Sequence, residues 1–252
     1  MIYFISFTHA DTCKQILFYN TDTNINNYKY LKIEFDKFFE KIGNYSFQPI
    51  IDKNIFENQL KEKKYCMLIT SSWYFNNIKD KLTLCPVLTA HRKGIEIQKI
   101  ILLKKTTPGD EGKKLDLHKG KFASSMSKEY TKELLNKILI DYKCNNNYNV
   151  LCVPKAIDAL LSVGLGMSRY ALSTYHSFNI LSKINPPLFN KLTCIGRNVD
   201  SPLMICTFFC QQKDQQLLNA FVNIDKIPEG INAIKMLGID GFKYYRRNTV
   251  SP

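Results

Sequence analysis

The first third of the chain alternates between short apolar runs and amphipathic stretches. Residues 65–69 (YCMLI) form an unbroken apolar run, which is typical of a strand buried on both faces of a sheet. Residues 28–42 place large apolar side chains at the 3.6-residue period and are followed by Gly43, so they predict a helix. The predicted series is strand 2–7, helix 28–42, strand 46–51, helix 54–61 and strand 65–69. This order predicts a parallel sheet with helices on both sides.

Residues 120–140 (GKFASSMSKEYTKELLNKILI) begin a second series of the same kind. A short strand at 121–123 leads through three serines into a helix whose apolar positions recur at the helical period. Ser127 suits the N-cap of this helix, and Glu129 places an acid in its first turn, where the helix dipole favours it. The later predicted elements are strand 149–153, helix 154–163, strand 169–172, a helix reaching Leu181, strand 203–210, and helices 214–224 and 228–237.

The two series predict two α/β lobes, each with a mostly parallel sheet flanked by helices and with one cleft between them. A loop rich in glycine, proline and charge at residues 106–118 follows two further predicted strands, 84–88 and 95–103. We place the lobe boundary at this loop or just before it, at the long strand. The expected division is residues 1–90 plus about 200–252 for lobe 1 and about 91–199 for lobe 2, with hinge strands near 84–103 and 181–203.

Hydroxyl-rich or aromatic segments follow several predicted strands, at the carboxyl ends where α/β sheets collect ligands. The serine turn at 124–127 combines free backbone N–H groups with three hydroxyls, which favours an anion site; an ordinary capped helix is the alternative. Trp73, the only tryptophan, is either part of a ligand wall or a core residue at a helix start. The candidates from these segments are Thr8, His9, Ser71, Ser72, Trp73, Tyr74, Ser124, Ser125 and Ser127.

The net charge of +13 favours anionic partners, although a solvated, lysine-rich surface is the alternative. The lysines are scattered and no nucleic-acid-binding motif is present, so we expect no nucleic-acid partner. The aromatic and basic segment at 241–247 is the feature that would favour such a partner; a frayed, solvated terminus is its alternative. A small anion bound in a pocket explains more of the chain than a nucleic acid does.

Eight cysteines and four histidines are spread along the chain. No C-x-x-C pair occurs, so we expect no metal site, and most cysteines lie in apolar segments as small buried side chains. Eight apparently unpaired cysteines favour a reducing compartment. The histidines are dispersed and no nucleophile elbow or H-E-x-x-H motif is present, so we expect neither an enzyme nor a cofactor.

The apolar runs are too short to span a membrane, and the first residues (MIYFISFTHADT) lack the basic and apolar regions of a signal peptide. From this segment we expect either a leader that has been removed or a cytoplasmic protein.

The order of these elements resembles the substrate-binding proteins of phosphate, phosphite and phosphonate ABC transporters, which have the type 2 periplasmic binding protein fold. Residues 28–75 are similar to the family's opening helix, glycine turn and strand ending in a hydroxyl-aromatic segment (ITSSWYF). Residues 115–135 (LDLHKGKFASSMSKEYTKELL) are similar to its serine-rich turn and helix, and residues 156–181 (AIDALLSVGLGMSRYALSTYHSFNIL) to its second ligand segment. Residues 200–208 (DSPLMICTF) resemble its entry into a later strand.

The resemblance implies a small anionic ligand held in the cleft, a periplasmic location, and an ABC transporter permease or a sensor as partner; we expect a monomer. It places the anion on Ser125, Ser127 and nearby backbone N–H groups. The side chains that the resemblance adds around the anion are Ser124, Lys128, Ser72, Tyr74, Ser173, Thr174 and Tyr175.

Three departures from the family pattern separate this chain from its typical members. No aspartate precedes the serine turn, and Arg169 stands where a Gly-x-x-Asp pattern often leads into the strand. No clear acid stands in the ligand segments to bind an aminoalkyl cation, unless Asp11 or Asp200 does so. A different ligand, or a sensory or enzymatic role on the same fold, is therefore the alternative.

Overall fold

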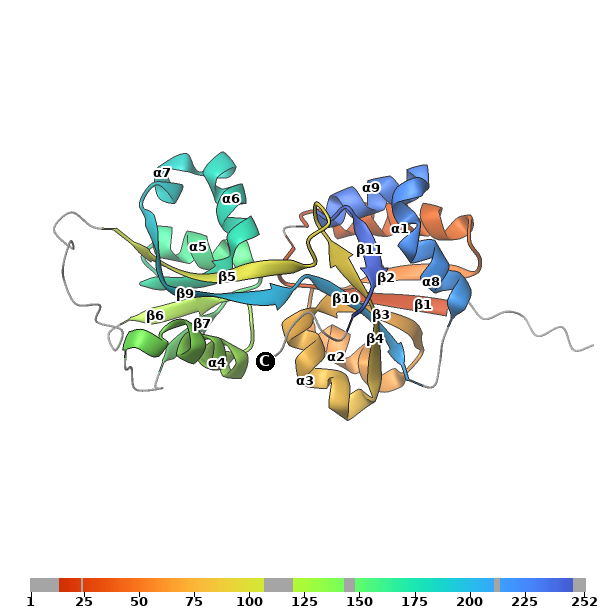
Figure 1. The fold of residues 1–252 in the computed structure, drawn as a ribbon, viewed down its shortest axis with the longest axis horizontal. Helices are drawn as coiled ribbons and strands as arrows, with labels where there is room; N and C mark the ends of the chain where they lie inside the picture. Colours follow the sequence, from red (N-terminus) through yellow and green to blue (C-terminus); the bar gives the residue numbers. More distant parts are fainter. Residues whose placement is uncertain (1–13, 24, 107–119, 143–147, 211–213, 247–252) are drawn as a thin grey trace, which may run out of the picture.

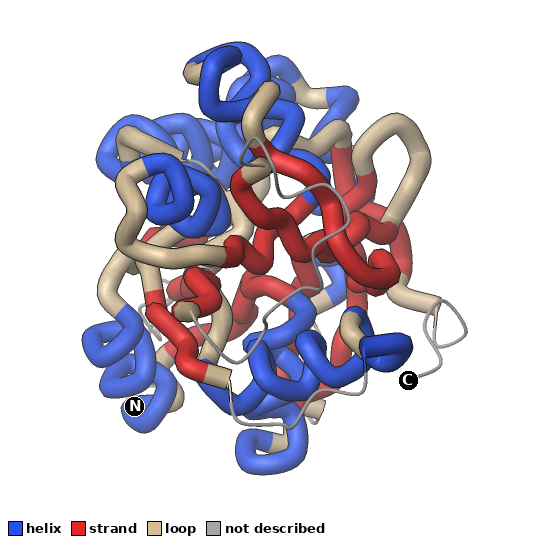
Figure 2. Tube along the Cα trace, turned by 90° about the vertical axis from the view of Figure 1, so that its left-hand side faces the viewer, coloured by secondary structure: helices blue, strands red, loops and turns tan. Residues whose placement is uncertain are grey.

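The protein consists of two lobes that lie side by side (Figure 1). The structure is a computed structural model, which describes residues 14–23, 25–106, 120–142, 148–210 and 214–246. Each lobe contains one sheet, and helices cover both of its faces. An end-on view shows the strands in the interior and the helices around them (Figure 2). The α/β class and the two-lobed architecture predicted from the sequence are confirmed.

The sheet of the first lobe has six strands in the order β11-β4-β10-β3-β1-β2. The three strands β2, β1 and β3 are parallel, whereas β10 and β11 run antiparallel to their neighbours, so the sheet is mixed rather than mostly parallel. The bounds are β1 (Lys14–Tyr19), β2 (Tyr45–Pro49), β3 (Tyr65–Ser71), β4 (Leu84–His91), β10 (Met204–Phe209) and β11 (Gly241–Tyr244).

Two groups of helices enclose this sheet, α1, α8 and α9 on one face and α2 and α3 on the other (Figure 1). Stacked phenylalanines anchor α1 to the sheet, with the rings of Phe35 and Phe47 only 4.0 Å apart. The bounds are α1 (Tyr28–Glu40), α2 (Lys53–Glu62), α3 (Ser72–Leu82), α8 (Gln215–Val222) and α9 (Pro228–Leu237), with a 3-10 turn at Ile224–Lys226. Burial of these aromatic faces supplies the hydrophobic free energy that holds the lobe together.

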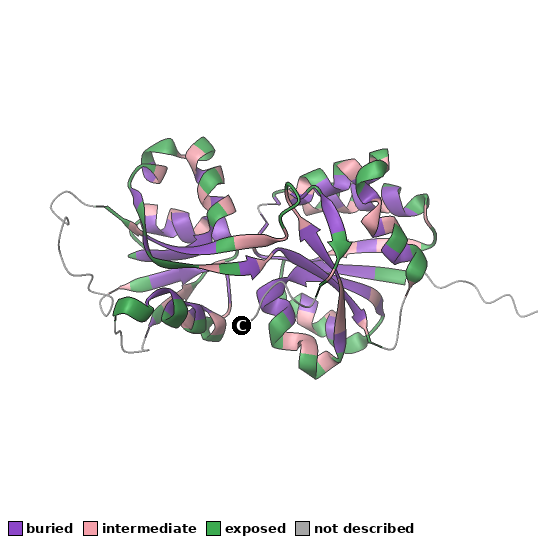
Figure 3. Cartoon of the chain, in the orientation of Figure 1, coloured by how far each residue is buried: buried purple, intermediate pink, exposed green. Residues whose placement is uncertain are grey.

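The second lobe has a five-stranded sheet in the order β7-β6-β8-β5-β9, in which β7, β6 and β8 are parallel and β5 is antiparallel to both neighbours. Its strands are β5 (Ile97–Lys105), β6 (Lys121–Ser124), β7 (Asn149–Cys152), β8 (Tyr170–Thr174) and β9 (Leu192–Pro202). Its helices are α4 (Lys128–Ile138), α5 (Ala156–Gly164), α6 (Tyr175–Ile184) and α7 (Pro186–Phe189), with a 3-10 turn at Ile140–Tyr142. Figure 3 shows buried residues concentrated in the strands of both sheets and exposed residues on the outer helix faces.

The chain passes between the lobes twice, from β4 to β5 and from β9 to β10. Strands β5 and β9 pair over most of their length and extend together toward the first lobe (Figure 1). Gln98 of β5 is the register partner of Ser201 of β9, so this pair lies at the end of the two strands where the lobes meet. We propose that these two paired strands act as the hinge, because a small change in backbone angles there would turn one lobe against the other.

Some strands differ from those the sequence predicts. The described part of the first sheet begins at β1, which the hydrophobic pattern missed, while the predicted strand 2–7 lies outside the described residues. Residues 241–244 are not frayed, because they form β11, which pairs with β4 along the edge of the sheet. The pairing potential of an exposed strand edge accounts for this, since it recruits a short polar segment without an apolar pattern.

A disulfide joins Cys85 of β4 to Cys210, the residue that follows β10. The expectation that all eight cysteines are unpaired is therefore wrong. The two residues are 125 positions apart in sequence, and only the antiparallel pairing of β4 with β10 brings them together. No local spacing signals such a bond.

Candidate functional site between the lobes

Strands from both lobes end facing one another across the lobe boundary. In Figure 1 the carboxyl ends of β1 and β3 point toward the second lobe, and those of β6 and β8 point toward the first. A direct hydrogen bond joins the two sides, from the backbone N–H of Ala156 to the carbonyl oxygen of Thr21 (3.2 Å). Strand ends that face one another in this way are the usual ligand site of α/β sheets.

The turn between β6 and α4 holds the serines that the sequence singles out. Ser127 is the N-cap of α4, as predicted, and its hydroxyl accepts a hydrogen bond from the backbone N–H of Tyr130 (3.2 Å). The Ser124 hydroxyl is fully buried and accepts hydrogen bonds from Met126 N (3.2 Å) and Thr131 Oγ1 (3.0 Å). Lys128 begins the helix with an exposed side chain.

Ser125 differs from the other serines of the turn. Its side chain is 7% exposed and its Oγ has no hydrogen-bond partner. A buried hydroxyl without a partner costs free energy, so such a group in a native structure calls for an explanation. At the N-terminus of α4 the positive end of the helix dipole adds to the attraction for an anion.

We expect Ser127→Ala to lower the free energy of unfolding by about 1 kcal/mol, because the mutation removes the cap of α4. Ser127→Asp keeps an acceptor at the N-cap and should retain most of the stability. Urea unfolding of the three proteins measures the difference, and equal stability of Ser127→Ala and wild type would contradict the capping role.

The segment after β3 is helical rather than a loop. Helix α3 begins at Ser72, whose hydroxyl lies 2.8 Å from Ser201 Oγ and donates to the carbonyl of Pro202 (2.9 Å), tying α3 to β9. Tyr74 is buried and its hydroxyl donates to Glu57 of α2 (3.2 Å). Ser71 keeps a buried hydroxyl without a partner at the end of β3, so it is the serine of this segment with unused hydrogen-bonding capacity.

Trp73 forms an aromatic contact between the lobes. Its ring stacks on that of Tyr130 of α4 at 6.1 Å and 25°. The indole is 3% exposed, and its Nε1 has no hydrogen-bond partner. The side chain is therefore buried at a helix start, yet it also forms part of the boundary between the lobes.

Two of the second lobe's predicted ligand residues direct their hydroxyls into their own lobe. Ser173 donates to the carbonyl of Ala156 (2.7 Å), and Thr174 caps α6 by accepting from Ser177 N (3.0 Å). Tyr175 is half exposed at the start of α6. A hydroxyl that completes a cap has little capacity left for a ligand, which separates this segment from Ser125.

The sequence reasoning missed the segment that follows β1, residues 20–23 (NTDT). The predicted loop containing Thr8 and His9 lies outside the described residues, whereas the 20–23 segment lies directly at the lobe boundary. Asp22 is its acidic side chain: Gln98 of β5 donates to its Oδ2 (3.2 Å), and its Oδ1 is buried without a partner. The sequence does carry a pattern that indicates this segment, because a polar turn directly follows the apolar run ILFY.

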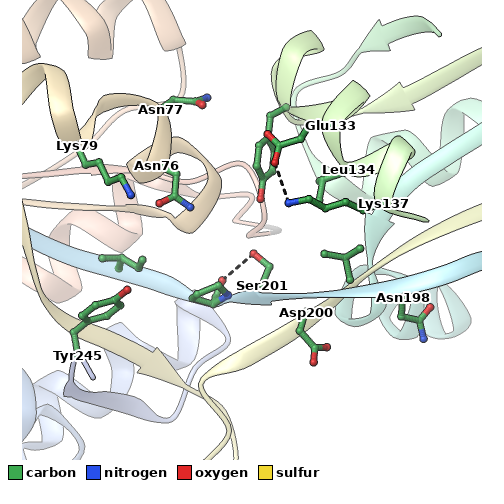
Figure 4. A pocket seen from close by; sticks show the side chains of 14 residues that line it. Asn76, Asn77, Lys79, Glu133, Leu134, Lys137, Asn198, Asp200, Ser201 and Tyr245 are labelled. Carbon is green, nitrogen blue, oxygen red and sulfur yellow. Dashed lines mark hydrogen bonds and ion pairs between the residues drawn. The ribbon is translucent and has the colours of Figure 1, made fainter. Parts of the chain in front are cut away.

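A pocket of about 660 Å³ opens between α3, α4 and β9; its lining includes Tyr130 and Ser201 but neither Ser125 nor Asp22. Figure 4 shows Asn76, Asn77 and Lys79 on one wall and Glu133 and Lys137 on the other, with β9 below. Lys137 is paired with Glu133 (2.9 Å). The volume falls within the range of about 300–1,000 Å³ that small-molecule sites occupy.

The described residues contain no group of three histidine, cysteine or acidic side chains placed to hold a metal ion. None of the described helices is long and apolar enough to cross a membrane.

No family model matches the sequence, and no curated protein is similar to it in sequence. Solved structures do match its fold. A binding protein component of an ABC phosphonate transporter from Pseudomonas aeruginosa has a TM-score of 0.70 at 12% identity, covering 92% of this chain and 82% of that one. PhnD1 from Prochlorococcus marinus, in complex with methylphosphonate, has a TM-score of 0.65 at 13% identity, covering 93% of each chain.

A protein from Xanthomonas citri bound to ATP has a TM-score of 0.70 at 11% identity, covering 94% of this chain and 93% of that one. At these identities the likeness shows the fold alone. The resemblance to periplasmic binding proteins predicted from the sequence is confirmed at that level.

Proposed function

We propose that this protein is a solute-binding protein that captures a small anion of the phosphate or phosphonate type between its lobes. The observation that carries the proposal is the Ser125 hydroxyl, which is buried and unpartnered at the N-terminus of α4. An anion oxygen at this point would accept hydrogen bonds from the Ser125 hydroxyl and from backbone N–H groups of the first turn, satisfying donors that the fold leaves unused.

The comparisons support this class of ligand. Two of the matched proteins are named for phosphonate transport or hold methylphosphonate, and a third holds ATP, another anion with phosphoryl groups. They also favour a binding role over an enzymatic one. We propose a transporter permease or a sensor as the partner of the loaded, monomeric protein.

A periplasmic location fits the same proposal. The Cys85–Cys210 bond supports an oxidising compartment, because disulfides persist there and are rare in the cytoplasm.

The test is titration calorimetry of the wild-type protein with phosphate, phosphite, methylphosphonate and ATP, at low and at moderate salt. We expect saturable binding of at least one small anion, at one site per chain, with affinity that changes little with salt, because a buried site is screened much less than surface charge. Lys64→Ala serves as a surface control, since that side chain is 78% exposed.

Binding that weakens steeply with salt and with loss of exposed lysines would instead indicate a polyanion on the surface, as for a nucleic acid. That result, or the absence of saturable binding across the panel, would contradict the proposed function.

A further inference from the structure

Asp22 lies at the same lobe boundary as the serine turn that is proposed to bind an anion. The carbonyl of Thr21, the preceding residue, accepts a hydrogen bond from Ala156 N, and Val153, three residues before Ala156, donates its N–H to the carbonyl of Ser124 (2.9 Å). These contacts bring the segment after β1 close to the serine turn. The pKa of Tyr130, in the first turn of α4, is raised to about 12. Burial is the largest cause, Glu133 is the second, and the charge of Asp22 is the third.

One oxygen of the Asp22 carboxyl group accepts a hydrogen bond and the other does not. Oδ2 accepts from Gln98 of the hinge strand β5, whereas Oδ1 is shielded from solvent and has no partner. Gln98 is the register partner of Ser201, whose hydroxyl lies 2.8 Å from that of Ser72. Asp22 is thereby fixed at the hinge, between the two lobes.

No cation among the described residues forms an ion pair with Asp22 or lowers its pKa. Lys155, the N-cap residue of α5, donates instead to the carbonyl of Ile25 (2.8 Å) and to Asn26 (3.3 Å). The titratable groups that Asp22 affects, Tyr19 of β1 and Tyr130 of α4, are neutral at neutral pH because burial raises the pKa of both. Burial raises the pKa of Asp22 itself to about 6, against the hydrogen bond from Gln98, which lowers it.

An ionised carboxylate at this position would repel the anion, whereas the neutral acid has a proton to donate to it. We propose that Asp22 binds the captured anion as the neutral acid, donating a hydrogen bond to an anion oxygen, so that capture at neutral pH takes up one proton. The inference rests on the proposed function and adds that the site binds its anion when Asp22 is protonated.

The direction of the pH dependence follows from the linkage between proton binding and anion binding. Because the anion binds the protonated form, its affinity is highest below about pH 6 and falls as Asp22 ionises. With one proton involved, the affinity should fall about tenfold between pH 5 and pH 7. Asp22→Asn keeps the shape of the side chain and a neutral donor, so its affinity should stay close to the wild-type value at pH 5 and vary little with pH.

The experiment is calorimetry of wild type and Asp22→Asn from pH 5 to pH 8 with two probes, methylphosphonate and methanesulfonate. Methanesulfonate stays a monoanion throughout this range, so any proton in its complex comes from the protein. Repeating the wild-type titration at pH 7 in two buffers of different ionisation enthalpy counts protons directly and should give about one per anion. Because this proton count uses only the wild-type protein, it tests the inference even if Asp22→Asn fails to fold.

The outcomes separate this inference from the function on which it rests. Wild-type affinity for methanesulfonate that falls with pH, together with a flat profile in Asp22→Asn, supports the inference. Binding of methylphosphonate without binding of methanesulfonate at pH 5 overturns it, because the ligand would then supply the proton. The same pH profile in wild type and variant also overturns the inference. Neither of these two results contradicts the proposed anion site. No saturable binding of either probe overturns both.

Discussion

Ser125→Ala should weaken anion binding by about 10- to 150-fold, because it removes a hydrogen bond from a hydroxyl to a charged oxygen, worth roughly 1.5–3 kcal/mol. The same change should leave the free energy of unfolding unaltered or slightly higher, since the Ser125 Oγ has no partner within the chain. Loss of affinity without loss of stability separates a ligand-binding hydroxyl from a structural one. Calorimetry and urea unfolding of the same preparations measure the two quantities.

Ser168→Ala is the matched control for this prediction. Ser168 is also 7% exposed and its Oγ also lacks a partner, but it precedes β8, at the end of the strand away from the first lobe. Its replacement should leave the affinity unchanged. Equal affinity of wild type and Ser125→Ala, or an equal loss in both variants, would remove Ser125 from the site.

Phe122→Ala should lower the free energy of unfolding by about 3–5 kcal/mol, the usual cost of removing a fully buried phenylalanine ring. Phe122 is at 0% exposure in β6, stacks on Tyr170 of β8 at 4.6 Å, and meets Tyr148 edge-on at 5.3 Å. This strand delivers the serine turn to the lobe boundary, so the variant should also bind anions less well. Urea unfolding followed by circular dichroism provides the measurement.

Phe122→Leu keeps much of the buried volume and should cost clearly less than the alanine change. A loss below about 1 kcal/mol for Phe122→Ala would show that the second lobe does not depend on this aromatic stack.

The sequence predicts the elements that carry strong local patterns. Helix α1 follows from its apolar periodicity, strand β3 from its unbroken apolar run, and the N-cap of α4 from a serine at the right distance from the first apolar position. The fold class could be predicted because the order of strands and helices is itself the pattern of a two-lobed α/β protein.

Tertiary contacts decide what local patterns do not. The hydroxyls of Ser72 and Ser173 look like ligand groups in the sequence, yet contacts with Pro202 and Ala156 use them inside the protein. The role of Asp22 depends on Gln98, 76 positions away, which no spacing rule connects to it. Only Ser125 and Ser71, among the described candidate serines, keep a buried hydroxyl without a partner.

A crystal structure of the protein grown with methylphosphonate is the most direct test of the central claim, that one small anion binds between the lobes. It should show one phosphonate group at the N-terminus of α4, within hydrogen-bond distance of Ser125 Oγ and of backbone N–H groups in the first turn. Phosphonate bound only to exposed lysines, or Ser125 Oγ still without a partner in a crystal saturated with the ligand, would contradict it.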